Sequence, residues 1–166
     1  MRPAVRKVAL TAHVASSVGW LGAVIVFLTL GIIALLSSDP ATVRGVYLVM
    51  EPAARWALVP LAFASLLTGC IQALLTDWGL FRHYWIVFKL SITVFATVIL
   101  LVYLRTFRIM SIAAADRVTD LGMVRNLSPV IHAALALLLF LVAMTLAIYK
   151  PRGMTSYGWR TRYGGT

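Results

Sequence analysis

The stretch of residues 8–36 contains no Asp, Glu, Lys or Arg. A helix needs about 20 mostly apolar residues to cross the hydrocarbon of a bilayer, and this stretch is longer than that. Three basic residues (Arg2, Arg6 and Lys7) precede it, and the polar segment SSDP follows it. Because the apolar region of a cleaved signal peptide spans only about 7–15 residues, the sequence predicts a retained membrane span over about 8–36.

Three further stretches are also long and mostly apolar, at about 56–76, 84–107 and 129–149. Ser128 and Pro129 form a strong helix start at the last of these, since serine caps a helix and proline at the first helical position loses no hydrogen bond. The chain is 61% hydrophobic and 12% charged, with a mean hydropathy of +0.93, whereas soluble domains are about 25% charged. We therefore predict an all-α fold, an integral membrane four-helix bundle in one domain (residues 1–150).

Two segments outside the predicted spans have distinctive compositions. The stretch TVRGVYLVMEPAAR places Arg44, Glu51 and Arg55 among apolar residues, which predicts a short amphipathic helix at the membrane interface between the first two spans. The C-terminal tail (151–166) is basic, aromatic and rich in glycine. We expect a loosely ordered segment that lies on lipid headgroups.

The net charge of +10 and the pI of about 10.7 come from residues at the ends of the spans. Those positions favour lipid headgroups as partners and argue against nucleic acid. An even number of spans places both termini on one side, with eight Lys or Arg residues there against six on the other side. The positive-inside rule then predicts that both termini are cytoplasmic. The single cysteine, Cys70, excludes an internal disulfide.

Ionisable side chains inside a span are costly, and each is a candidate functional residue. His13, Lys89 and His132 are of this kind, and His83 lies at a span boundary. His13 lies about 7 Å inside the first span, and Lys89 lies at much the same level, because both spans enter from the side of the termini. His132 enters from the far side, roughly 20 Å away. We expect His13 and Lys89 to approach each other, with His83 as an outer neighbour and His132 too distant to share a metal.

His13 and Lys89 each have two possible roles. His13 lies on a stripe with Ser16 and Trp20 beside a seam of Ala and Gly, so it either ligates a cofactor or hydrogen-bonds a neighbouring helix. Lys89 has no acidic partner inside a span. Its ammonium either reaches back to nearby headgroups or binds an anionic group such as a haem propionate.

Motifs of soluble enzymes are absent: the chain has no P-loop, no CxxC and no GxSxG, and no carboxylate pair lies in a span. Proton-coupled transport would require an Asp or Glu within the membrane, and the spans contain none. The sequence therefore favours a protein that is not an enzyme.

The motifs HVASSVGWLG and HYWIVFKL resemble those of small multi-span bacterial membrane proteins. The layout resembles an uncharacterised four-span family and is distantly similar to CopD-like copper-resistance membrane domains and HemJ-type protoporphyrinogen oxidases. They share a first-span histidine followed by W-x-G (His13, Trp20 and Gly22 in this chain) and a lysine after an aromatic residue (Trp85 and Lys89). The resemblance implies a bacterial cytoplasmic (inner) membrane and haem, with His13 as metal ligand and Lys89 as partner. We place Trp20 and His83 beside the cofactor.

Three functions follow from these patterns. The first is a haem-binding or redox role with His13 as axial ligand. The second is a non-catalytic component that assembles with copies of itself or with other membrane chains through faces rich in Ala and Gly. The third is the handling of copper or another metal ion, although the six methionines are scattered along the chain.

Overall fold

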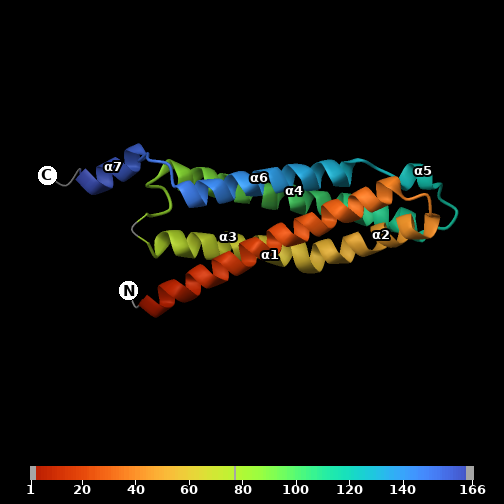
Figure 1. Ribbon diagram of the computed structural model, residues 1–166, viewed down its shortest axis with the longest axis horizontal. Helices are drawn as coiled ribbons and strands as arrows, with labels where there is room; N and C mark the ends of the chain where they lie inside the picture. Colours follow the sequence, from red (N-terminus) through yellow and green to blue (C-terminus); the bar gives the residue numbers. More distant parts are fainter. Residues whose placement is uncertain (1–2, 77, 164–166) are drawn as a thin grey trace.

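The computed structural model describes residues 3–76 and 78–163, and this part of the chain is helical without any strand (Figure 1). Four of its helices are long and apolar enough to cross a membrane, as the sequence predicts. Arg2, Asp77 and the last three residues of the tail lie outside the described residues. The elements in chain order are α1 (Pro3–Leu36), α2 (Pro40–Ala53), the π-helical turn η1 (Ala54–Leu58), α3 (Val59–Leu74), α4 (Tyr84–Ala115), α5 (Leu121–Val124), α6 (Ser128–Tyr149) and α7 (Ser156–Tyr163).

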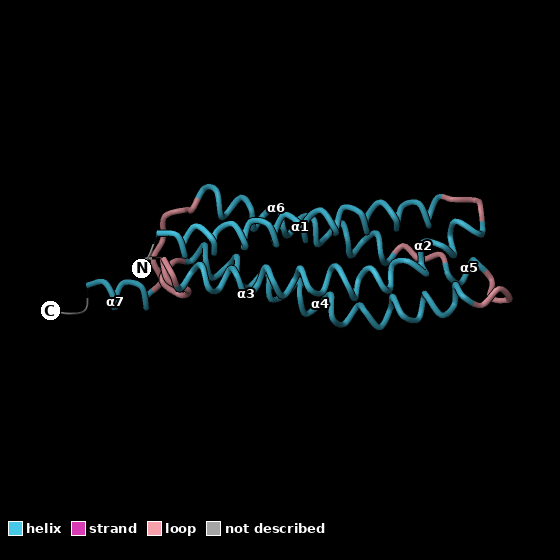
Figure 2. Tube along the Cα trace, turned by 90° about the horizontal axis from the view of Figure 1, so that it is seen from below, coloured by secondary structure: helices cyan, strands magenta, loops and turns pink. Residues whose placement is uncertain are grey.

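The long helices form an elongated bundle in which α1 packs against α3 and α6, and α4 packs against the same two helices (Figures 1 and 2). Helices α1 and α4 therefore face each other along a diagonal. The start of α1 and helix α7 lie at the same end of the bundle (Figure 1), here called the terminal end. The opposite end, where α5 lies, is called the α5 end.

Residues 40–74 are helical without a break, so a separate short interfacial helix is not confirmed. The π-helical turn lies between Pro52 and Pro60. Proline lacks the backbone N–H that donates the i→i−4 hydrogen bond of an α-helix. A π-helical turn accommodates the missing hydrogen bond. The amphipathic pattern itself is real, but protein covers the apolar face, because α2 packs against α4. The buried residues of this face are Val43, Val46, Tyr47 and Met50.

The tail, expected to be loosely ordered, carries the helix α7 within its described residues. Thr155 anchors it to the loop before α4: its Oγ1 donates to the Phe81 carbonyl at 2.6 Å, and its backbone N–H donates to the Arg82 carbonyl at 3.0 Å. Gly158 lies so close to that Arg82 carbonyl that any side chain would collide with it. These contacts tie the start of α7 to the end of the bundle.

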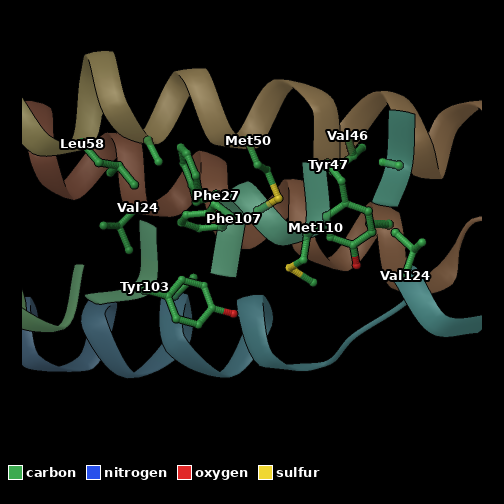
Figure 3. Close-up of a cluster of buried hydrophobic side chains, with 14 of the residues drawn as sticks. Val24, Phe27, Val46, Tyr47, Met50, Leu58, Tyr103, Phe107, Met110 and Val124 are labelled. Atoms are coloured by element: carbon green, nitrogen blue, oxygen red, sulfur yellow. The ribbon is translucent and has the colours of Figure 1, made fainter. Parts of the chain in front are cut away.

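The most completely buried side chains gather at the α5 end (Figure 3). Tyr47 and Met50 of α2 are 1% and 0% exposed, and they pack in one cluster with Met110 of α4 and Val124 of α5. Burial of side chains of this size contributes about 1.5–3 kcal/mol each. This cluster fixes α2 and α5 on the end of α4.

Arg44 of α2 holds the end of α4. Its guanidinium donates hydrogen bonds to five carbonyls at distances from 2.5 to 3.4 Å. The last carbonyls of a helix lack partners within the helix and carry the negative end of its dipole, so a cation with five N–H donors suits them. The acceptors are the carbonyls of Ala113, Ala114, Asp116, Arg117 and Thr119.

Asp39 caps the start of α2. Its carboxylate accepts from Thr42 Oγ1 at 2.6 Å, from the Thr42 N–H at 3.0 Å and from the Ala41 N–H at 3.2 Å. These hydrogen bonds, that of the Thr42 side chain first, hold the pKa of Asp39 below its ordinary value. The cap therefore stabilises the fold above the ordinary pKa of an aspartate, and its contribution disappears as the pH falls through the lowered pKa.

We predict that Arg44→Ala lowers the free energy of unfolding by about 2 kcal/mol, because it leaves carbonyls at the end of α4 without donors. Arg55→Ala provides the matched control. Arg55 makes a half-exposed ion pair with Glu51 one turn away, so its loss should cost under about 1 kcal/mol. Thermal unfolding of the detergent-solubilised protein measures both. Equal effects of the two substitutions would contradict the role given to Arg44.

Candidate binding site

His13 and Lys89 meet inside the bundle near the terminal end. The Lys89 Nζ lies 3.3 Å from His13 Nε2. Since α1 and α4 stand on a diagonal, this contact crosses the interior of the bundle. The structure thus brings together the two residues that the sequence placed at one level.

Thr68 of α3 fixes the other side of the imidazole. His13 Nδ1 lies 3.2 Å from Thr68 Oγ1, and that hydroxyl donates to the Ala64 carbonyl at 2.5 Å. Because the hydroxyl proton is engaged with Ala64, the threonine oxygen accepts from Nδ1–H. His13 Nε2 is then the acceptor for an N–H of Lys89. The hydrogen bonds therefore assign a neutral imidazole that accepts from the amine of Lys89.

Small side chains make room for this contact. A Cβ atom on Gly69 would lie 3.0 Å from His13 Cε1, so the ring rests directly on the backbone of α3. Ser16 Oγ lies 3.2 Å from Thr68 Oγ1 and donates to the His13 carbonyl at 3.1 Å. The sequence analysis missed Thr68 and Gly69. Their signal is an adjacent polar and small residue in LTGC, but only the register between α1 and α3 shows that they face His13.

A cavity of about 510 Å³ surrounds the pair and is lined by α1, α3, α4 and α6 together with the loop before α4. Lys150, at the end of α6, also lines it and lies 5.7 Å above the centre of the Trp78 ring. Two lining groups, Gln72 Oε1 and Trp85 Nε1, are buried without a hydrogen-bond partner among the described residues. Unpaired buried polar atoms are rare in native proteins.

The structure places the other candidates differently. Trp20 is 4% exposed and packs on Phe140 with ring centres 4.4 Å apart, forming a wall of the cavity. His83 bonds the Trp78 carbonyl through Nδ1 at 2.9 Å and packs against the Trp78 ring. His83 is not among the described residues that line the cavity. The structure therefore brings Trp20, but not His83, to the cavity of the His13–Lys89 pair.

His132 lies at the level of the α5 end of the bundle. A Cβ atom on Gly31 would lie 3.0 Å from Val130 Cγ2, so these two residues share a level. Gly31 follows His13 by eighteen residues, or about 27 Å of helix, so His132 lies more than about 20 Å from His13. Within residues 3–76 and 78–163, no group of three or more His, Cys, Asp or Glu side chains could hold a metal ion.

In comparisons with known proteins, no family model, no curated protein and no solved structure matches the chain. The fold and the site together define a helical bundle with four candidate membrane spans and with an amine and an imidazole in a cavity between its helices. Such a pair binds anionic groups through the amine and offers one imidazole nitrogen as a ligand.

We predict that Gly69→Val destabilises the protein by about 1–3 kcal/mol, because the new side chain overlaps the His13 ring and forces the packed site apart. Gly22→Val is the matched control, since a Cβ atom on Gly22 meets nothing within 4 Å. Its effect on unfolding should stay within about 0.5 kcal/mol. Thermal unfolding compares the two, and a harmless Gly69→Val would show that the ring does not rest on α3.

Proposed function

We propose that this chain is a multi-pass membrane protein whose cavity at the terminal end binds haem, with His13 as axial ligand and Lys89 as the partner of a propionate. The observation that carries the proposal is the 3.3 Å contact between His13 Nε2 and Lys89 Nζ at the wall of a cavity of about 510 Å³. Cavities of about 300–1,000 Å³ are typical of sites for cofactors and other small molecules. The resemblance of the sequence to HemJ-type proteins agrees with this function.

The lengths of the helices support insertion in a membrane. Helix α6 has 22 residues, or about 33 Å, which matches a hydrocarbon core of about 30 Å. The other three candidate spans have 34, 35 and 32 residues, so they extend beyond α6. We propose that their additional turns at the α5 end, near Tyr47 and Arg44, extend out of the membrane into water. The continuous helix of residues 40–74 then crosses the interface near Arg55 and Trp56 of η1, and α2 does not lie flat on it.

The charges of the cavity favour an anionic ligand. Lys89 and Lys150 line it, and no carboxylate does so among the described residues. An ammonium has three N–H donors, and the described residues accept only one of those of Lys89, at His13 Nε2. The remaining wall is mostly apolar. A flat apolar molecule with carboxylates on one edge has the complementary shape and charge.

The donor set fits haem better than a bare copper ion. Copper sites draw on several protein donors, whereas a haem iron is held by as little as one histidine. His13 supplies one imidazole whose Nδ1–H is already oriented by Thr68, an arrangement typical of metal-bound histidines. In the bound protein Lys89 would leave Nε2 and pair with a propionate. Haem would supply one-electron chemistry, and we assign no catalytic residue to the chain.

We predict that protein expressed with a supply of haem and purified in detergent shows a Soret band at about one haem per chain. His13→Ala should lower the haem affinity at least tenfold, because the iron loses its protein ligand. Lys89→Met should weaken binding by up to about tenfold, the value of one charge-assisted hydrogen bond, and leave the spectrum of the bound haem in place. Absorbance titration with haem measures each affinity.

His83→Ala is the matched control, because this histidine is held at the loop by Trp78. It should bind haem like the wild type. A colourless wild-type protein after haem supply contradicts the proposal and leaves the two other functions, a non-catalytic assembly component and the handling of a metal ion. Loss of the Soret band in His83→Ala but not in His13→Ala would contradict the assignment of the ligand.

We further propose that the protein lies in a bacterial cytoplasmic membrane with both termini in the cytoplasm, since eight basic residues lie on the side of the termini and six on the other. A reporter that is active only in the cytoplasm should be active when fused after Tyr163 and inactive when inserted at Thr119, in the loop between α4 and α5. The opposite pattern would reverse the orientation.

A further inference from the structure

A second cavity, of about 220 Å³, lies between α1, η1, α4 and α6, toward the α5 end. Six aromatic rings line it, and His132 is the only histidine among its described lining residues. Trp20 and Phe140 line both cavities and pack against each other with their rings tilted by 54°, so this pair lies between the cavities. The aromatic residues are Trp20, Phe27, Phe95, Tyr103, Phe107 and Phe140.

The hydrogen bonds of His132 determine which of its nitrogens carries the proton. His132 Nδ1 lies 2.8 Å from the Ser128 carbonyl and 3.3 Å from Ser128 Oγ. A carbonyl oxygen only accepts, so the shorter contact requires a proton on Nδ1. The neutral ring then has a bare Nε2 with a lone pair. No described residue donates a hydrogen bond to that nitrogen.

The other polar groups of this cavity are already engaged or too distant. The Tyr103 hydroxyl donates to Ser128 Oγ at 2.8 Å, and the Tyr103 ring stacks on His132 with centres 4.2 Å apart. Trp20 packs on Phe140, which follows His132 by eight residues, or about 12 Å along α6. The Trp20 ring therefore cannot contact both Phe140 and His132. The part of the cavity near His132 therefore offers an acceptor and no free donor.

We infer that this cavity binds the head of a membrane quinol, with a ring hydroxyl donating to His132 Nε2. An apolar cavity of about 150 Å³ is large enough to bind benzene, so about 220 Å³ holds a substituted ring. The aromatic walls favour an aromatic guest over an aliphatic alcohol, because aromatic pairs gain energy beyond the burial of area. A quinone has carbonyls in place of hydroxyls and cannot donate to Nε2. The site therefore prefers the reduced form.

The test compares two redox forms of one ligand. A benzoquinol with a decyl tail, and the same molecule oxidised to the quinone, are titrated anaerobically into the full-length protein in nanodiscs and followed by calorimetry. The quinol should bind about tenfold more tightly, since tenfold is the size of one net hydrogen bond. This comparison uses the wild-type chain alone and does not depend on the stability of any variant.

Two variants of His132 separate its two nitrogens. In His132→Asn the amide reaches the Ser128 carbonyl but places no acceptor at the position of Nε2, so the quinol should bind about tenfold more weakly, like the quinone. In His132→Gln the longer amide reaches the cavity with both an acceptor and a donor. It should bind the two redox forms about equally. Ala136→Leu, which keeps His132 and fills the cavity one turn further along α6, should weaken both forms alike.

Three results would overturn the inference: no binding of either form, equal affinity of the wild type for both forms, or a quinol preference that survives in His132→Asn. Unfolding temperatures close to the wild-type value show that a variant is folded. This site does not involve His13 or Lys89, so haem binding and quinol binding succeed or fail independently.

Discussion

A polar group buried between these helices needs a partner within the protein, because the surrounding apolar side chains offer none. This requirement organises the structure. The imidazole of His13 is held between Thr68 and Lys89, and the Thr68 hydroxyl in turn donates to the Ala64 carbonyl. The exceptions are informative for the same reason. Gln72 and Trp85, which line the larger cavity, each keep a buried polar atom without a partner among the described residues.

The four long helices could be predicted because length and apolar character are local properties of the sequence. The surface that packs against an apolar helix face, in contrast, is not a local property of the sequence. The pattern of residues 42–55 indicated an amphipathic helix, and the pattern alone does not distinguish a lipid surface from a protein surface as its partner. The structure covers that face with α4 and continues the helix through a π-helical turn into α3.

The candidate site was predicted in part. Counting 1.5 Å per residue placed His13 and Lys89 at one level, and their 3.3 Å contact agrees with it. Thr68 and Gly69 escaped prediction because the register between α1 and α3 depends on the intervening loop and on helix packing. His83 was expected nearby, but it precedes α4 in an extended conformation, and its ring is held by Trp78. Depth along a helix is thus readable from sequence, while orientation around the bundle is not.

His13 and His132 both lie within helices, and their different surroundings give the same type of side chain different properties. In each, a hydrogen bond to the helices holds Nδ1 and leaves Nε2 as the reactive nitrogen: Thr68 does this for His13, and the Ser128 carbonyl does it for His132. Beside the Nε2 of His13 lies a cation, whereas the cavity of His132 is lined by aromatic rings. The first setting favours an anionic molecule and the second an uncharged donor. Trp20 and Phe140 line both cavities and pack against each other, so the two imidazoles lie on either side of this pair of rings, each among its own neighbours.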